Sequence, residues 1–180
     1  KEKLKIKNYS KVKFNSLNYK KWRLGSEEQL NDIYKIENEF NKLKSITNIR
    51  VGIATLKDKV FFVDDNSEIE NKITKKLIKI NEYKKSEELK KNKLKVIFPY
   101  FKKNHRYFPL DPTVVKKKFP KAYNYLISQK EELSQRSKGK LNLKFFYEWG
   151  RIQSMEALGP KLLTGTFSKG PNFLLDKTDS

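Results

Sequence analysis

The most informative hydrophobic pattern lies in residues 49–63, where two apolar segments flank a short polar loop. Alternate residues from Ile49 to Ile53 are apolar, which is the pattern of a half-buried strand. Val60 to Val63 is a continuous β-branched and aromatic run that is suited to a buried strand. The loop between them carries one hydroxyl and two ammonium groups. The pattern therefore predicts two strands whose connecting loop faces a ligand.

A helix is predicted directly before this segment, from Ser26 to Lys44. Ser26 followed by Gln29 makes a capping box, and acidic residues in the first turn with lysines in the last turn suit the helix dipole. Apolar residues at helical spacing define the expected core face: Leu30, Ile33, Ile36, Phe40 and Leu43. We expect this face to pack on the sheet that begins at Ile49.

The segment from Ser67 to Asn92 is polar, with isolated apolar residues. Four of them keep a helical spacing: Ile69, Ile73, Leu77 and Ile80. This spacing leaves two interpretations open, a helix or a mobile lysine-rich excursion. Leu94 to Phe101 then reads as a strand, and Pro99 confines this strand to a sheet edge or a bulge.

Turn residues and prolines organise the next part of the chain. Residues 102–105 (KKNH) turn the strand back into Arg106 to Leu110, which predicts a β-hairpin with a cationic tip. Asp111-Pro112 is expected to cap a short helical turn that runs through Val115. Pro120 starts a second amphipathic helix that ends near Arg136. A loop, Ser137 to Lys140, follows.

The C-terminal part contains an aromatic run, Phe145 to Trp149, and a short predicted helix, Ile152 to Leu158, that Gly159-Pro160 stops. Residues 161–166 and 172–176 read as two strands around a turn. About six strands and three to four helices in mixed order are typical of the α+β class. We therefore expect a mixed β-sheet of short strands and hairpins, with three to four helices packed on it.

Length and composition predict one compact domain with a protruding arm. The chain has 180 residues, of which 37% are hydrophobic, enough for one ordinary core. Residues 1–23 form a basic arm or linker, and the choice between a linker that packs over the core and an arm that contacts phosphates is open. Residues 24–180 are assigned to a single domain. The chain begins without Met and ends just after a strand-like run, so we expect a fragment of a longer protein.

Charge points to a polyanionic partner. The 41 Lys and Arg residues exceed the 21 Asp and Glu residues, for a formal net charge of +20, and nucleic acid is the expected polyanion. The chain has no cysteine and a single histidine, His105, which excludes disulfides, thiolate metal sites and most zinc sites. No apolar run approaches the roughly 18 residues of a membrane span, and no signal core is present. We expect no membrane partner and a cytoplasmic location.

The sequence offers little for catalysis. It contains neither a glycine-rich phosphate loop nor a nucleophile-elbow motif. Phe98-Pro99-Tyr100 is similar to the Pro-Pro-Tyr end of an amino-methyltransferase motif, but it lacks the preceding acidic or Asn residue and the second Pro. Whether the chain belongs to an enzyme is therefore uncertain from these residues alone, and no catalytic, cofactor or metal residue is assigned.

Four strings carry a family resemblance, in this order: IRVGIATLKDKVFFV, VIFPY, FPKAYNYLISQKEELSQRS and FYEWGRIQSMEALGPKLLTGTFSKGPNFLLD. From about Trp22 to its end, the chain resembles the target-recognition (TaqI-like specificity) domain that follows the catalytic domain in adenine-specific DNA methyltransferases of type II restriction-modification systems. The resemblance implies a domain that packs beside the methyltransferase domain of the same parent chain and reads double-stranded DNA in the major groove.

The resemblance also implies what this fragment lacks. A catalytic domain outside these residues would methylate a flipped adenine with S-adenosylmethionine, so no cofactor is expected in the fragment itself. The family's glycine-rich cofactor loop and its Pro-Pro-Tyr tetrapeptide are absent. A parent chain that is fused to a nuclease fits the same pattern. We expect the domain to be monomeric.

Candidate DNA contacts are divided by side-chain geometry. Lysines in predicted loops are expected to contact phosphates: Lys57, Lys59, Lys102, Lys103, Lys138, Lys140 and Lys169. Forked or amide side chains are expected to read bases, guanine by Arg106 and Arg151 and adenine by Asn104 and Gln153. For Arg151, an ion pair with Glu148 or Glu156 is the structural alternative.

Two other functions stay open. In an RNA-binding module, aromatic residues such as Tyr147 and Trp149 would stack on unpaired bases while lysines follow the backbone. An aromatic run is, however, more often part of a core. A basic domain that docks on acidic lipid surfaces agrees with the net charge, but the sequence shows no basic helix with a wide apolar face.

Overall fold

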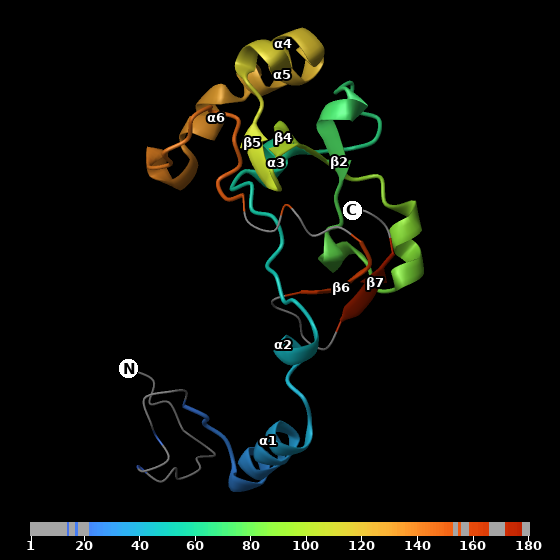
Figure 1. The fold of residues 1–180 in the computed structure, drawn as a ribbon, viewed down its shortest axis with the longest axis vertical. Helices are drawn as coiled ribbons and strands as arrows, with labels where there is room; N and C mark the ends of the chain where they lie inside the picture. The colour runs from blue at the N-terminus through green and yellow to red at the C-terminus, as the bar shows by residue number, and fades with distance from the viewer. Residues whose placement is uncertain are drawn as a thin grey trace, which may run out of the picture. The chain divides into compact units, whose positions relative to one another are not determined.

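The computed structural model describes residues 14, 17, 22–152, 155, 159–165 and 172–177 (Figure 1). The chain divides into two compact units, residues 1–50 and 51–180. The predicted arm, residues 1–23, lies almost entirely outside the described residues. The assignment of residues 24–180 to one domain stays a prediction.

The first unit contains α1 (Glu27–Glu39) and α2 (Leu43–Ile46). The capping box is confirmed, because Ser26 Oγ accepts from the Gln29 N–H at 3.3 Å and Gln29 Oε1 accepts from the Ser26 N–H at 3.1 Å. The predicted end of the helix at Lys44 is wrong, since Phe40 already has extended backbone angles. Phe40 and Asn41 are weak helix formers. None of the residues of α1 is buried in the described structure.

The apolar stripe of the first unit is not a core face. Ile33 is 39% exposed, Ile36 58%, Phe40 65% and Leu43 62%. The expected packing of this helix on a sheet at Ile49 is also wrong, because residues 49–53 form no strand. The local sequence pattern is enough to predict the helix, but it does not indicate which part of the protein packs on the apolar face of that helix.

A small antiparallel sheet lies at the centre of the second unit, with the strand order β1-β3-β2. It consists of β1 (Phe62–Val63), β2 (Thr74–Lys76) and β3 (Lys95–Ile97). Phe62 pairs with Val96, and Thr74 pairs with Ile97. The central strand β3 is the most apolar, and Val96 and Ile97 are buried.

The predicted strand pair in residues 49–63 is mostly wrong. Ile49 and Val51 are each 69% exposed, and only Ala54 forms an isolated antiparallel bridge, with Arg151. The start of the second predicted strand is the short helix α3 (Asp58–Phe61). Thr55 explains this local fold, because its hydroxyl donates to Asp58 Oδ1 and accepts from the Lys57 N–H, which favours a helical turn. The predicted burial of residues 60 and 61 is nevertheless confirmed.

The segment after β1 is not the helix that its apolar spacing suggested. It contains the 3₁₀ helices η2 (Asn71–Ile73), η3 (Ile80–Glu82) and η4 (Ser86–Lys91), together with β2. The pairing of β2 with β3 outweighs the helical pattern, and Ile73, which ends η2 directly before β2, is buried in the core.

The predicted single strand from Leu94 to Phe101, confined to a sheet edge or a bulge, is wrong. Pro99 instead divides this segment into β3, which is the central strand of the three-stranded sheet, and β4 (Tyr100–Lys103), which belongs to a separate sheet. β4 pairs with β5 (Arg106–Pro109) as the predicted hairpin. The Asp111-Pro112 cap is confirmed, because Asp111 Oδ1 accepts from the Thr113 N–H at 2.9 Å.

Three helices follow the hairpin: α4 (Pro112–Lys118), α5 (Pro120–Ser128) and α6 (Lys130–Ser134). The predicted second helix therefore starts at Pro120 as expected, but it is interrupted at Gln129. The predicted loop 137–140 is largely the 3₁₀ turn η5 (Arg136–Gly139), in which Ser137 and Lys138 have positive φ.

The last strands, β6 (Lys161–Thr164) and β7 (Phe173–Asp176), form an antiparallel pair as predicted. The turn between them and most of the predicted helix 152–158 lie outside the described residues. Within the described part of the chain, small antiparallel sheets are combined with several helices. The structure is therefore α+β, as the sequence predicts.

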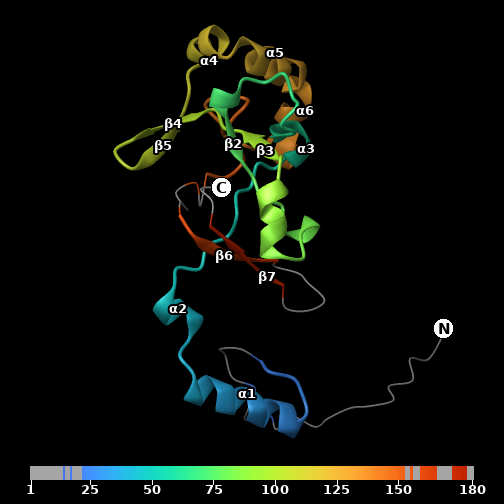
Figure 2. The ribbon, with the colours of Figure 1, turned by 90° about the vertical axis from the view of Figure 1, so that its right-hand side faces the viewer.

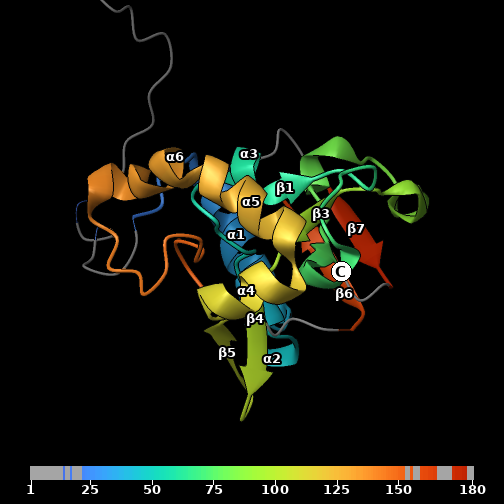
Figure 3. The same ribbon diagram turned by 90° about the horizontal axis from the view of Figure 1, so that it is seen from above.

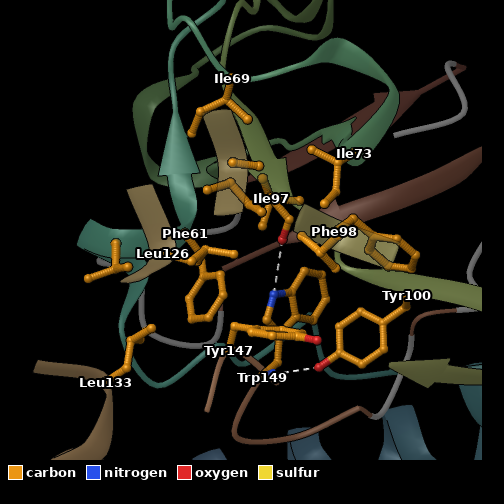
Figure 4. Close-up of a cluster of buried hydrophobic side chains, with 14 of the residues drawn as sticks. Phe61, Ile69, Ile73, Ile97, Phe98, Tyr100, Leu126, Leu133, Tyr147 and Trp149 are labelled. Atoms are coloured by element: carbon orange, nitrogen blue, oxygen red, sulfur yellow. Dashed lines mark hydrogen bonds between the residues drawn. The ribbon is translucent and has the colours of Figure 1, made fainter. Parts of the chain in front are cut away.

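Aromatic and aliphatic side chains together form the core of the second unit (Figure 4). The Trp149 ring makes edge contacts with Phe98 and Tyr100, with centroids 5.3 Å and 5.5 Å apart, and its Nε1–H donates to Ile97 O at 3.2 Å. Tyr147 and Trp149 are 0% and 2% exposed. These rings belong to the core and are not exposed stacking surfaces. The Phe98-Pro99-Tyr100 segment is buried in the same core.

Candidate nucleic-acid interface

The β4–β5 hairpin carries the largest group of predicted contact residues. Its two-residue turn, Asn104-His105, has φ values of 48° and 59°, which is the type I′ geometry that suits a tight hairpin. The turn fixes the register, so that Lys103 pairs with Arg106 and Lys102 pairs with Tyr107. Figures 2 and 3 both show the hairpin projecting outward from the helices and strands of its unit.

One face of the hairpin combines exposed rings with cations. Because side chains alternate along strands, Phe101, Lys103, Arg106 and Phe108 share this face. The two phenyl rings are 44% and 42% exposed, and their centroids lie 5.9 Å apart. Together with Asn104, these residues line a shallow hollow of about 520 Å³. No acidic residue lines this hollow in the described part of the chain.

The opposite face of the hairpin points towards the body of the unit. Lys102 lies over the Tyr107 ring, with Nζ 5.7 Å from the centroid. The hairpin therefore places predicted phosphate contacts on both faces and predicted base readers at its turn and first pair.

Lys57 and Lys59 lie at the start of α3 and differ in their surroundings. Lys57 Nζ forms an ion pair with Glu132 Oε1 at 2.6 Å. The carboxylate offsets the lysine charge and so weakens the attraction of Lys57 for an external anion. Lys59 is exposed and makes no ion pair in the described structure. Lys138 and Lys140, around η5, are also exposed.

Arg151 is held by its backbone beside the segment that leads into α3. Its N–H donates to Ala54 O and the Gly150 N–H donates to Thr55 O, both at 3.1 Å. A Cβ on Gly150 would lie 2.3 Å from a Leu56 side-chain carbon, so this close approach requires glycine. The Arg151 side chain forms no ion pair with Glu148, whose carboxylate instead accepts from the Phe145 N–H at 2.6 Å. Glu156, Gln153 and Lys169 lie outside the described residues.

The hairpin thus brings together Lys102, Lys103, Asn104 and Arg106, whereas Lys138, Lys140 and Arg151 lie on other segments. Sequence reasoning missed the exposure of Phe101 and Phe108. Strict alternation on the two strands is the signal that would have placed both rings with the cations. It also missed three lysines outside the hairpin: Lys72, Lys75 and Lys118.

The comparison with known proteins gave no match, either to a protein-family model or to a curated protein. The family resemblance of the four sequence strings is therefore an expectation only.

A buried arginine connects the core to the segments that carry Lys57 and Arg151. Arg136 is 2% exposed and donates to the carbonyl oxygens of Thr55, Phe146 and Glu148 at 2.7–3.1 Å. Burial lowers the pKa of Arg136, since the charged form is desolvated. All the acceptors that the structure gives this guanidinium are backbone carbonyls, so it acts as a structural crosslink.

The described residues show no group of three His, Cys, Asp or Glu side chains that could hold a metal ion. Nor does any helix in the described ranges have the length and hydrophobicity needed to cross a membrane.

Proposed function

We propose that this chain binds double-stranded DNA as the target-recognition domain of an adenine-specific DNA methyltransferase of a restriction-modification system. The methyltransferase domain of the parent chain, which acts on cytoplasmic DNA with S-adenosylmethionine, supplies the chemistry. The domain positions the target base for that catalytic domain. The β4–β5 hairpin is the observation that carries the proposal.

The hairpin has the dimensions of a groove reader. The major groove of B-DNA is about 12 Å wide and 8.5 Å deep and admits a two-stranded β-ribbon. Strands of four residues at about 3.4 Å per residue reach roughly 13 Å, enough to bring the turn to the base edges. The type I′ turn keeps this ribbon narrow at its tip.

The side chains of the hairpin divide into two roles. Asn104 presents an amide that can pair with adenine, and Arg106 presents a fork that can pair with the O6 and N7 atoms of guanine. Lys102 and Lys103 are charged side chains on opposite faces of one strand, so they can meet phosphates on the two sides of a groove.

Fluorescence anisotropy of the 180-residue chain with a randomised duplex tests the proposal. If about six phosphates are neutralised, affinity falls roughly a thousandfold between 50 and 200 mM salt. Selection from the random duplex pool should enrich a sequence, and Arg106→Ala should relax the preference at one base pair at a cost of about 1–3 kcal/mol. Lys59→Ala is the matched control and should weaken all duplexes about equally. Binding without salt dependence, or a pool that stays random, would refute the proposal.

A second candidate function is supported by the exposed rings of the hairpin. Phe101 and Phe108 can stack on unpaired bases, while Lys103 and Arg106 follow the backbone of a single strand. Competition between duplex DNA and single-stranded RNA separates the two functions. Tighter RNA binding that is lost in Phe101→Ala would favour the RNA-binding module.

A further inference from the structure

A cationic cleft lies on the face of the hairpin opposite the exposed phenyl rings. Its volume is about 390 Å³, and it is bordered by η2, β2, the hairpin and α4. Each of these four parts of the fold contributes one ammonium group to the lining: Lys72, Lys75, Lys102 and Lys118. No acidic residue lines the cleft among those that the structure describes.

Aromatic rings hold two of these ammonium groups in place. Lys75 Nζ lies 4.1 Å from the centroid of the Phe98 ring and 5.4 Å from that of Tyr107. Lys102 Nζ lies 5.7 Å from the centroid of the same Tyr107 ring. Such cation–π contacts orient an ammonium group without neutralising its charge.

The lysines of the cleft differ from others in the same unit. Lys57, Lys95 and Lys121 each pair with a carboxylate. Within the described ranges, none of the four cleft lysines takes part in an ion pair. Like charges that converge without a counter-ion repel one another, and an anion in the cleft would remove this repulsion.

We infer that this cleft binds a backbone phosphate of the nucleic acid whose groove the hairpin enters. This inference rests on the proposed function and adds a defined phosphate site to it. The position of the cleft supports it, because Lys102 and Tyr107 belong both to the hairpin and to the cleft lining. The walls of a groove are phosphate backbones, so a ribbon inserted between them carries its flanking residues against one wall.

The test compares two double variants of the 180-residue chain that lose equal charge. Lys72→Gln with Lys118→Gln empties the cleft of two exposed cations and leaves the hairpin unchanged. Lys90→Gln with Lys91→Gln is the control, since both lysines are exposed on η4 and do not line the cleft. The probes are a duplex and a base-free tetramer of deoxyribose phosphate.

One lost phosphate contact lowers the salt slope by about 0.9, which is roughly an eightfold loss of affinity at 0.1 M salt. In the cleft variant we expect this loss for the duplex and about a fivefold loss for the single-stranded tetramer, whose slope per phosphate is about 0.7. We expect little change in the control. Equal losses in the two variants, or no loss in the cleft variant, would overturn the inference. If the wild-type chain binds the base-free tetramer through the cleft but selects no duplex sequence, the phosphate site stands and the proposed base reading fails.

Discussion

Arg136 offers the sharpest test of how the second unit is held together. Its guanidinium is buried and donates from Nε to Leu133 O at 2.8 Å and from Nη1 and Nη2 to Thr55 O, Glu148 O and Phe146 O. These acceptors lie on three separate segments of the chain. The perturbation is Arg136→Met, which keeps much of the side-chain length and removes every donor.

The loss in the free energy of unfolding of Arg136→Met depends on which carbonyl oxygens keep no other hydrogen-bond donor. Thr55 O keeps the Gly150 N–H, and Leu133 O keeps the Gln135 N–H. Phe146 O and Glu148 O have no other donor in the described structure. Both hydrogen bonds are part-buried, so each unsatisfied carbonyl costs about 1–2 kcal/mol, the lower part of the range for buried groups, and the loss is roughly 2–4 kcal/mol. Relief from burying a charge offsets part of it, so we expect about 2 kcal/mol.

Urea unfolding of the 180-residue chain, followed by tryptophan fluorescence and circular dichroism, measures this loss. Trp149 lies in the same core and reports on it directly. Arg106→Met is the matched control, because Arg106 is exposed on the hairpin and should change stability by no more than about 0.5 kcal/mol. A free energy of unfolding for Arg136→Met within about 0.5 kcal/mol of the wild type would refute the crosslinking role.

Two further predictions concern local features. His105→Gly should stabilise the chain by about 0.5–1 kcal/mol in urea unfolding, because φ is 59° at this position and Asn-Gly suits a type I′ turn; a lower midpoint would contradict this. Glu70 accepts from the Lys121 and Ala122 N–H groups, which lower its pKa although partial burial opposes them. Its stabilisation is therefore present above the unfolded pKa of about 4.3 and is lost as pH falls through the folded pKa. Glu70→Gln should lower the thermal midpoint at neutral pH, and the difference in midpoint between wild type and variant should become smaller in acid. A difference in midpoint that does not change with pH would contradict the stabilising role of the Glu70 carboxylate.

Features with a local cause could be predicted from the sequence. The capping box at Ser26, the Asp111-Pro112 cap and the Pro120 helix start each depend on residues within one turn of one another. The hairpin belongs to this group, since its two-residue turn fixes the register of both strands.

Features that depend on distant partners could not be predicted. The alternation from Ile49 to Ile53 suggests a strand, but no strand among the described residues pairs with it, and an unpaired segment stays irregular. The ion pair that occupies Lys57 reaches Glu132, 75 residues away. The cationic cleft has the same origin, because Lys72, Lys75 and Lys118 come from three elements that only the fold brings together.

The root of the β4–β5 hairpin, where its strands meet the core, explains how the hairpin can be held in a defined direction. On one strand, the Tyr100 hydroxyl accepts from the Trp149 N–H in the core. On the other, the Leu110 N–H donates to Pro99 O at 2.9 Å, and Leu110 O accepts from the Tyr147 hydroxyl. Burial raises the pKa of both tyrosines above its ordinary value, which already lies well above neutral pH. The aromatic residues that sequence reasoning considered for base stacking, Tyr147 and Trp149, therefore fix the root of the hairpin whose exposed tip presents the cations.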